Sequence, residues 1–443
     1  MRYSEFVFES YRYDPADASL SLTYRFAEGP RFEERLVFDF PPQPLSADAE
    51  IVLDKIFRLI FLLSGVSYYK AFVPEALRCE SFPLDRDTAA FVQKFYEKGL
   101  AEFAWKNRIS LRGRCRFEWD AVGVAPPLAL DLLRRTCVPI GGGKDSIVTL
   151  ECLKAPGENL VLFSLGDAAP IAASIAAAGL PFIRVRRRLD PALLELNNEG
   201  ALNGHVPITG ILSAIVLACA VLAGFDAVAM SNEHSASAPN LVIDGFGINH
   251  QYSKSLEFEV DFADYVARHI TPSIAYFSLL RPLPEIEIAR RFAQHPQYFE
   301  VFRSCNSAFR QSPSERRRNW CCDCPKCRFV FLALAPFLAK RELIAIFGRD
   351  MLDDEAQTVG FAELCGLRDH KPFECVGEIA ESAAVMTFLR SDPDWRGDTV
   401  VRRLVADFPS LRERGPPAFR ALLEARHPHR VPSDFLAKLD ACG

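Results

Sequence analysis

The first 45 residues alternate between apolar and polar side chains. Residues 20–24 and 36–40 show the two-residue period of half-buried strands, and a pair of prolines follows the second run. Helical spacing of apolar side chains follows over residues 47–63 and 87–104. We therefore predict a small α+β domain over residues 1–134.

From about residue 135 the pattern changes to short apolar strands that alternate with helices. Such alternation indicates a parallel sheet with right-handed crossovers, and ligands bind such sheets beyond the carboxyl ends of the strands. The loops after Ile140, Phe163 and Met230 should therefore share one crevice. We assign residues 135–335 to this α/β domain. The predicted strands are residues 136–140, 160–164, 182–185 and 227–230, and the predicted helices are residues 145–154, 170–180 and 207–224.

Beyond residue 335 the chain becomes charged, and its apolar residues take helical spacing. Residues 341–347, 382–389 and 417–425 carry this spacing, and prolines and glycines separate them. We predict a helical C-terminal region over residues 336–443.

The composition is that of a globular protein of the cytoplasm. Of the 443 residues, 49% are apolar and 25% are charged, and the formal net charge of −5 argues against a nucleic-acid binder. The first residues lack the apolar region of a signal peptide, and the longest apolar stretch, residues 211–223, is too short to span a bilayer. Most of the 13 cysteines are scattered singly, which favours a reducing cytoplasm over a disulfide framework.

A glycine-rich loop lies between the first strand of the α/β domain and the helix that follows. It is not a Walker A loop, because an aspartate follows its lysine, and it does not fit the G-x-G-x-x-G pattern. It resembles the pyrophosphatase loop of the N-type ATP pyrophosphatases, which usually reads Ser-Gly-Gly-x-Asp-Ser. The loop consists of Gly141, which takes the place of the first serine, and of Gly142, Gly143, Lys144, Asp145 and Ser146.

This resemblance implies a site for ATP and Mg²⁺. Glycines let backbone N–H groups close around a pyrophosphate, and the helix that begins near Asp145 directs its positive end at the anion. Lys144 would add a positive charge, Asp145 would orient Mg²⁺, and Ser146 would donate to phosphate. Ser164, at the end of the second strand of the domain, is assigned to the same nucleotide site. The alternative is a glycine-rich turn that binds no ligand.

Four cysteines lie close together after residue 320. Cys321, Cys324 and Cys327 are evenly spaced, and Cys305 precedes them. Three thiolates at such spacing and a fourth from further away are typical of tetrahedral Zn²⁺ sites. The pattern resembles the four-cysteine zinc site of the deazaguanine nitrile synthases. Those enzymes have a glycine at the position of Cys322, so either Cys321 or Cys322 could be the ligand. Reduced structural cysteines and a catalytic thiol are the alternatives to zinc.

Three polar runs carry further candidate residues. Glu233 and His234 follow the last predicted strand directly, so they should face the crevice, although a lone histidine is usually structural. His250 and Lys254 lie in a second run, for which the alternative is a polar loop. Cys375 lies in a third run, His-Lys-Pro-Phe-Glu-Cys-Val-Gly, which alone would look like a turn.

Together these segments resemble the UDP-N-acetylmuramoyl-L-alanyl-L-glutamate epimerase family. The resemblance covers about residues 130–380 and rests on the glycine loop and the three polar runs. It implies an α/β fold with a parallel-sheet pyrophosphatase-loop core and a part in peptidoglycan precursor synthesis. A companion ligase would attach L-glutamate to the UDP-muramoyl-L-alanine precursor. The epimerase would convert the terminal L-Glu of UDP-N-acetylmuramoyl-L-Ala-L-Glu to D-Glu, with release of AMP and diphosphate.

The chemistry that the resemblance implies fits the loop. The α-hydrogen of an amino acid is hard to remove while its carboxylate is ionised, and attachment of AMP to that carboxylate removes the charge. A base would then take the proton, and an acid would return one to the other face. The candidates for these roles are Glu233, His234, His250, Lys254 and Cys375, which Cys305 joins if it binds no zinc.

Basic residues are the candidates for the anionic parts of the substrate. Lys254 and the basic runs at residues 184–188 and 316–318 could bind the UDP diphosphate or the glutamate side chain, although a solvated face is the simpler interpretation of each run. Residues 1–130 carry no motif, and recognition of the nucleotide-sugar end is the role that we expect for them.

Two other functions share parts of this pattern. A deazaguanine synthase-like or tRNA-modifying pyrophosphatase-loop enzyme would share the loop and the cysteines, but a tRNA modifier should carry a basic domain. A zinc-stapled protein that only senses nucleotide would need no bases in the crevice, and the polar run at Glu233 and His234 counts against it.

Overall fold

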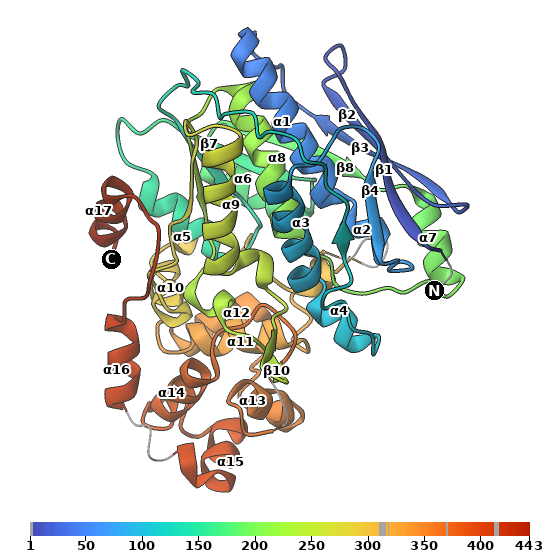
Figure 1. Ribbon diagram of the computed structural model, residues 1–443. Coiled ribbons are helices and arrows are strands. Elements are labelled where there is room, and N and C mark those ends of the chain that lie inside the picture. Colours follow the sequence, from blue (N-terminus) through green and yellow to red (C-terminus); the bar gives the residue numbers. More distant parts are fainter. Residues whose placement is uncertain (1–2, 310–315, 318, 369–370, 412–415) are drawn as a thin grey trace.

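The computed structural model describes residues 3–309, 316–317, 319–368, 371–411 and 416–443. The strands of its large sheet are β1 (Glu5–Asp14), β2 (Ser19–Phe26), β3 (Arg31–Phe38), β4 (Ala76–Cys79), β5 (Arg116–Phe117), β6 (Thr136–Pro139), β7 (Leu160–Leu165), β8 (Phe182–Arg188), β9 (Ala227–Met230) and β12 (Ala275–Ser278). Among the described residues these ten strands form one mostly parallel sheet, in the order β12-β9-β6-β7-β8-β3-β2-β1-β4-β5 (Figure 1). A separate hairpin pairs β10 (Leu241–Ile243) with β11 (Phe246–Ile248).

The parallel half of the sheet lies between two hydrophobic cores. Successive strand residues alternate between them, as the two-residue period requires: Cys137 and Val161 face one core, and Val138 and Leu162 face the other. Helix α8 (Ile208–Ala223) packs in the first core and α5 (Lys144–Leu153) in the second. The four strands predicted for this region are confirmed, and β12 is an additional strand at the edge of the sheet.

The N-terminal strands extend the same sheet. Strands β1, β2 and β3 form an antiparallel meander whose apolar face packs on α1 (Ala47–Ser64). Strand β3 then pairs antiparallel with β8, and Phe38 lies opposite Val185. One sheet and one core therefore continue across residue 134, and the domain boundaries at residues 134 and 335 stay predictions.

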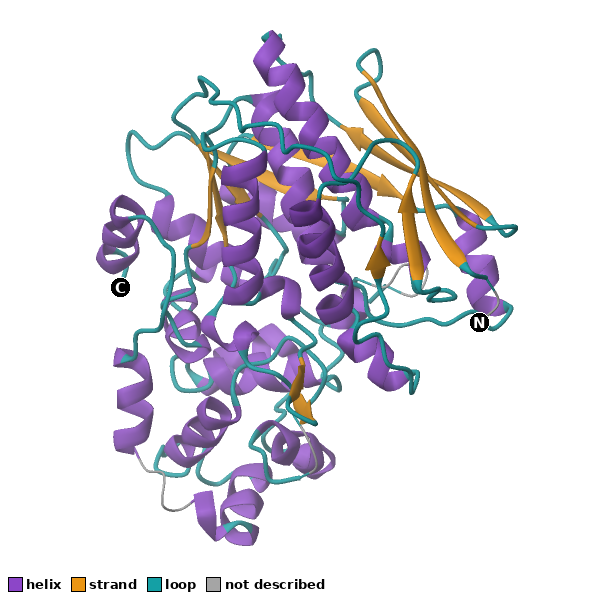
Figure 2. Cartoon of the chain, viewed as in Figure 1, coloured by secondary structure: helices purple, strands orange, loops and turns teal. Residues whose placement is uncertain are grey.

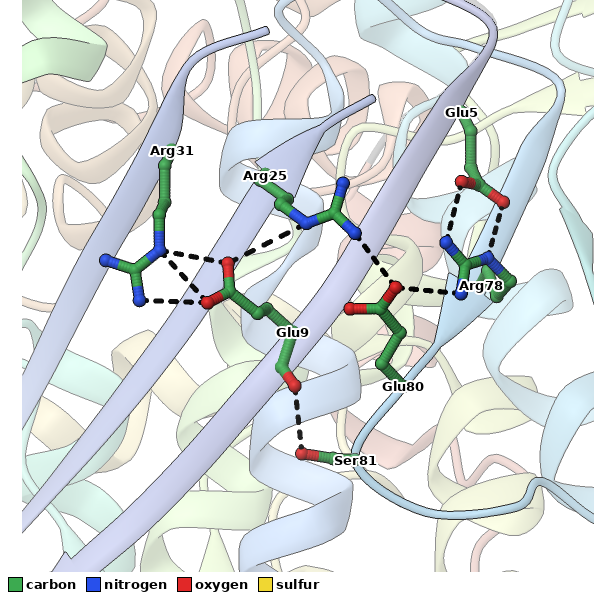
Figure 3. Close-up of polar contacts among 7 residues, drawn as sticks. All are labelled: Glu5, Glu9, Arg25, Arg31, Arg78, Glu80 and Ser81. Carbon is green, nitrogen blue, oxygen red and sulfur yellow. Dashed lines mark hydrogen bonds and ion pairs between the residues drawn. The ribbon is translucent and has the colours of Figure 1, made fainter. Parts of the chain in front are cut away.

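Charged side chains cover the opposite face of the meander. Figure 3 shows a chain of ion pairs that crosses β1, β2, β3 and β4. Exposed pairs of this kind contribute little free energy each, so the network marks the solvent side of the sheet more than it stabilises the fold. Its members are Glu5, Glu9, Arg25, Arg31, Arg78 and Glu80.

Residues 87–104 form two helices, where the sequence predicts one. Helix α3 (Arg86–Gly99) ends where the chain touches Pro207, because a Cβ at Gly99 would lie 2.7 Å from Pro207 Cγ. Leu100 leaves the helical region with φ −98° and ψ 11°, and α4 (Ala101–Lys106) follows as a separate helix. This break determines where the side chains of α4 point.

Beyond β12 the described chain is helical, as Figure 2 shows, and its helices pack in the second core. The helices predicted at residues 341–347, 382–389 and 417–425 are confirmed as α12, α14 and α16. The remaining helices of the chain complete the fold. The bounds are α2 (Val66–Tyr69), α6 (Ala169–Ala178), α7 (Pro191–Asn198), α9 (Leu256–His269), α10 (Glu285–Phe292), α11 (Pro325–Leu334), α12 (Lys340–Phe347), α13 (Thr358–Leu364), α14 (Ile379–Leu389), α15 (Thr399–Asp407), α16 (Pro416–Glu424) and α17 (Ser433–Ala441).

One disulfide departs from the reduced cysteines that the sequence leads us to expect. Cys152 of α5 is bonded to Cys442, directly after α17, so the end of the chain is tied to the helix that follows the glycine loop. In the described part of the chain, no helix is both long and apolar enough to cross a membrane.

Candidate active site

A cavity of about 580 Å³ lies at the carboxyl ends of β6, β7 and β9. Ile140, Phe163 and Met230 all line it, so the prediction that the loops at these positions share one crevice is confirmed. Its volume suits a small-molecule ligand. The polar wall consists of Gly141, Gly143, Lys144, Asp145, Ser146, Ser231, Asn232, Glu233, Lys254, Glu285, Ser304, Asn306, Lys326 and Cys375.

The glycine loop connects β6 to α5 and forms one end of the cavity. Gly142 has φ +78°, and a Cβ there would lie 3.0 Å from the Pro170 backbone, so both the conformation and the space favour glycine. A Cβ at Gly141 would meet open space. Gly141 N donates to Ser146 Oγ at 3.3 Å, which closes the loop over the first turn of α5. The free N–H groups of that turn make the loop a site for an anion.

Three buried serine hydroxyls near the loop are unsatisfied. Among the described residues, Ser164, Ser231 and Ser304 offer Oγ atoms to no hydrogen-bond partner. Ser231 and Ser304 belong to cavity-lining residues, and Ser164 stands between two others, Phe163 and Leu165. Buried polar groups are rarely left unpaired, so this wall fits a ligand that brings hydrogen-bonding atoms, as a phosphate does.

Three carboxylates meet beside the loop. One oxygen each of Asp145, Glu233 and Glu285 lies within 4.8 Å of the others, an arrangement that fits a hard divalent cation. Lys144 is buried among them, and its ammonium contacts Asp145 at 2.5 Å and also Glu285. Burial opposes the charge of Lys144, but the two carboxylates outweigh burial and raise its pKa. Two carboxylates therefore neutralise Lys144, which the sequence assigned as a free positive charge for phosphate.

A buried arginine joins the first two polar runs. Arg281 is fully buried, pairs with Glu259 at 2.9 Å, and donates to the backbone carbonyls of Glu233 and Lys254. These bonds fix both runs against the end of β12, although 21 positions separate Glu233 from Lys254 in the chain. Arg281 thereby positions Glu233 and Lys254 on one wall, and local sequence gives no signal of this role.

Cys375 completes the wall from the third polar run. Lys254 Nζ donates to its Sγ at 3.4 Å, and the His250 imidazole is near enough to the thiol to lower its pKa. Burial would raise the pKa of Cys375, but the ammonium groups of Lys254 and Lys326 and the bond from His250 lower it to about 6. The thiolate is therefore the main form near neutral pH, and it faces the cavity.

The two predicted histidines lie in different places. His250 is behind Cys375 rather than among the lining residues. His234 turns away from the lining residues: its ring stacks on His427 with 3.5 Å between ring centroids, and Nε2 lies 3.6 Å from Glu378 Oε1. The structure therefore brings Glu233 into the cavity and separates His234 from it, because adjacent residues after β9 point in different directions.

The cysteine cluster lies beside the cavity. The Sγ atoms of Cys305, Cys321, Cys324 and Cys327 all lie within 4.8 Å of one another. Cys321 and Cys324 lie 3.6 and 3.5 Å from Cys327, close to the edge of about 3.8 Å that Zn–S bonds of about 2.3 Å give a tetrahedron. The Cys322 thiol instead contacts the Phe347 carbonyl. The geometry fits zinc, with Cys321 as the ligand and Cys322 outside the set.

The described residues of the two basic runs are not among those that line the cavity. Arg186 and Arg187 pair with Asp39 and Glu34 across the β3–β8 junction. In the second run, residue 318 lies outside the described residues, as does His370 of the third polar run.

Some polar residues of the cavity carry no motif of their own, so the sequence did not identify them. They are Glu285, Ser304, Asn306 and Lys326. The nearest signal in the sequence is that three of them flank or separate the clustered cysteines.

An anion-binding loop on a parallel α/β sheet, with a cation-stabilised thiolate in the same cavity, defines an α/β enzyme. Residues 1–279 of the chain match the MurL N-terminal domain, and residues 301–417 match the MurL C-terminal domain. The chain belongs to the MurL family, whose curated members carry the name UDP-N-acetyl-alpha-D-muramoyl-L-alanyl-L-glutamate epimerase.

Three proteins of that name resemble the chain along nearly all of its length. The protein of Xanthomonas oryzae pv. oryzae (strain MAFF 311018) is 41% identical over 97% of this chain and 95% of its own. The protein of Salinispora tropica (strain ATCC BAA-916 / DSM 44818 / JCM 13857 / NBRC 105044 / CNB-440) is 43% identical over 92% of this chain and 90% of its own. The protein of Micromonospora sp. (strain ATCC 39149 / NRRL 15099 / SCC 1413) is 42% identical over 99% and 98%.

Proposed function

We propose that the chain converts the terminal L-glutamate of UDP-N-acetylmuramoyl-L-alanyl-L-glutamate to D-glutamate, coupled to ATP cleavage, in peptidoglycan precursor synthesis. The names of the three relatives support the substrate and the reaction. The observation that carries the proposal is that the glycine loop and the Cys375 thiol line one cavity. A ligase that adds L-glutamate to the muramoyl-L-alanine precursor would supply the substrate.

The glycine loop would serve the ATP half of this reaction as a pyrophosphatase loop. Its backbone N–H groups and the hydroxyls of Ser146, Ser231 and Ser304 would bind phosphates, and Asp145 with Glu285 would hold Mg²⁺, which leaves Glu233 available for proton transfer. ATP supplies the AMP group that masks the charge of the α-carboxylate, so that the α-hydrogen becomes acidic enough for a side-chain base. The unsatisfied hydroxyls and the three clustered carboxylates support this assignment.

Cys375 would serve the proton-transfer half. Its thiolate takes the α-proton, and the electron pair of the C–H bond moves into the activated carboxyl group as an enolate. A second group then returns a proton to the opposite face of the α-carbon, which inverts it without any change of oxidation state. Water would then hydrolyse the acyl–phosphate bond, which releases AMP and restores the free α-carboxylate. Glu233 and Lys254 are the predicted residues on the same wall that can carry this proton. Cations on the wall would stabilise the enolate oxygen.

Zinc at the four cysteines would have a structural part. Ser304 and Asn306 flank Cys305, and Lys326 lies between Cys324 and Cys327, so three cavity residues depend on the arrangement of the cluster. Bound Zn²⁺ would hold the two segments together and keep these side chains on the wall.

The proposed function is tested by one incubation in deuterated water with ATP, Mg²⁺ and UDP-N-acetylmuramoyl-L-Ala-L-Glu. We expect D-glutamate after acid hydrolysis, deuterium at its α-carbon, and release of AMP. ATP without the dipeptide substrate is the control. Neither D-glutamate nor deuterium at the α-carbon in the full reaction would contradict the epimerase assignment.

A further inference from the structure

A carboxylate from the N-terminal part of the chain lies directly behind the proposed base. Glu102 of α4 is 2% exposed, and its carboxylate accepts a hydrogen bond from His250 Nδ1, 148 positions further along the chain. The other carboxylate oxygen contacts Lys106 Nζ. The imidazole and the ammonium therefore provide partners for both oxygens of the buried carboxylate. A buried carboxylate needs such partners, because removal from water strongly disfavours its charge.

The histidine between the two groups links the carboxylate to the thiol. His250 bonds Glu102 on one side, and its imidazole lowers the pKa of the Cys375 thiol on the other. Burial lowers the pKa of His250, but the bonds to Cys375 and Glu102 outweigh burial and raise it to about 9. Burial likewise opposes ionisation of Glu102, and the His250 contact lowers its pKa to about 2. The order carboxylate, imidazolium, thiolate is that of an activated cysteine with an oriented histidine.

The other charged groups around this set reinforce the same state. Lys254 and Lys326 face the thiol from the second polar run and from α11. His205 lies on the far side of His250, with 4.2 Å between ring centroids, and Glu102 is 3.9 Å from its Nδ1. Burial and the neighbouring His250 charge lower the pKa of His205 to about 3, so His205 is uncharged at physiological pH. One imidazolium therefore lies between one carboxylate and one thiolate.

Helix α4 also supports the segment that carries the thiol. The Trp105 ring packs on Phe373, two residues before Cys375, with 4.8 Å between ring centroids. The Lys106 ammonium lies 5.5 Å from the centre of the same ring. The break between α3 and α4 sets the direction of Trp105 and Lys106, because α4 would otherwise continue along the axis of α3. A single short helix thus contacts both His250 and the Cys375 segment.

We propose that Glu102 is a positioning residue that holds His250 as a charged donor toward Cys375, and that the N-terminal part of the chain thereby completes the active site. The expected effect of Glu102 on catalysis rests on the proposed function, whereas its expected effect on the ionisation of Cys375 does not.

The test measures the ionisation of Cys375 in the full-length protein without substrate. The rate of alkylation by iodoacetamide is followed against pH, and mass spectrometry of the peptide isolates Cys375 from the other thiols. In Glu102→Gln the pKa of His250 should fall, so that less imidazolium is present where the thiol titrates. We expect the midpoint of the alkylation profile to rise by about one pH unit or more, since loss of a positive charge beside a thiolate raises the pKa of the thiol by about 1 to 3 units. In Glu102→Asp, which keeps the carboxylate, the midpoint should lie closer to the wild-type value.

Two further variants separate positioning from general damage. Glu97→Gln, on the preceding helix, removes a carboxylate that does not contact His250 and should leave the profile unchanged. If Glu102→Gln does not fold, His250→Gln tests the same link, because it removes the donor to Cys375 and leaves Glu102 paired with Lys106. His250→Gln should raise the midpoint, and the double variant should add little to it.

The outcomes also distinguish this inference from the proposed function. A wild-type profile in folded Glu102→Gln, or in His250→Gln when the first variant fails to fold, overturns the positioning role. A shifted profile in a protein that fails to epimerise the dipeptide supports the positioning role and contradicts only the assignment of the reaction.

Discussion

Lys254 Nζ lies 3.4 Å from Cys375 Sγ, and 121 positions separate the two residues in the chain. The contact joins the second and third polar runs and places an ammonium group on a thiol that faces the cavity. An opposite charge at this distance favours the thiolate strongly in a partly buried site. The proposed removal of the α-proton by Cys375 therefore depends on this pair.

Removal of the thiol should separate the two halves of the reaction. Cys375→Ala should reduce α-hydrogen exchange by about 100- to 10,000-fold, the usual contribution of a general base, because no other thiolate faces the substrate among the described lining residues. ATP–pyrophosphate exchange should persist, since the glycine loop is untouched. Cys79→Ala, on β4, is the matched control. Normal α-hydrogen exchange in Cys375→Ala would show that another group is the base.

The pH dependence of epimerisation should report the thiol and its histidine. The thiolate forms as pH rises through the Cys375 pKa of about 6, and the His250 imidazolium disappears as pH rises through its pKa of about 9. The activity kcat/KM should therefore increase near pH 6, reach a plateau, and decrease near pH 9. Lys254→Ala should move the acidic limb upward, because burial then raises the pKa of Cys375 with one cation fewer to oppose it. An acidic limb that stays in place would separate the activity from this thiol.

Loss of the loop aspartate should abolish AMP release and leave the fold intact. Asp145 is partly exposed at the cavity, so Asp145→Ala leaves no deeply buried gap. AMP is measured by chromatography and folding by thermal denaturation, with Asp394→Ala as an exposed control. Lys144 is a poor alternative target, because its removal leaves Glu285 buried without its cation, at a cost of about 3 to 5 kcal/mol. Undiminished turnover in Asp145→Ala would place the metal elsewhere.

Much of the fold follows from the periodicity of apolar residues. The strands after residue 135 and the long helix α8 form because their apolar runs fill two cores, and a local pattern suffices to predict them. At the end of α3 a Cβ at Gly99 would lie 2.7 Å from Pro207 Cγ, and this contact with a segment distant in sequence cannot be seen in the local pattern. Strand β12 is only four residues long, and its position at the edge of the sheet comes from pairing with β9.

The site was predictable where consecutive residues carry the chemistry. The glycine loop, Glu233, Lys254 and Cys375 stand in recognisable runs, and the sheet brings them together. Glu102, His205 and Arg281 act through partners in other segments, so their local sequence is that of ordinary helix and loop. Adjacent residues can also diverge, as Glu233 and His234 do, because the side-chain direction after a strand depends on the tertiary contacts that follow.

The cysteine cluster makes a prediction with an internal control. We expect about one equivalent of zinc per chain by elemental analysis, as four thiolates in this geometry bind it tightly. Cys321→Ser should lose the metal, whereas Cys322→Ala, one residue later, should retain it because that thiol contacts the Phe347 carbonyl. Wild-type protein with less than about a tenth of an equivalent, after purification without chelators, would rule out the metal site.

The junction between β3 and β8 should be sensitive to one charge. Glu34 is fully buried and pairs with Arg187. Glu34→Ala leaves Arg187 buried without its carboxylate and with the Ser67 hydroxyl as acceptor, and we expect the free energy of unfolding to fall by about 3 to 5 kcal/mol. Glu33→Ala, an exposed neighbour on the same strand, should change it by less than about 0.5 kcal/mol. Urea denaturation measures both, and equal effects would contradict a buried ion pair at this junction.

Glu102, His250 and Cys375 lie far apart in the chain, so the ribosome makes them at different times. A ribosome makes Glu102 early and Cys375 roughly a quarter of a minute to a minute later, at about 5 to 20 residues per second. Until then the nascent chain lacks this thiol, and afterwards the thiol gains its cations only when the third polar run packs against Lys254, Lys326 and His250. A chain that ends before residue 375 therefore lacks the proposed base, although it already holds the carboxylate that orients the histidine.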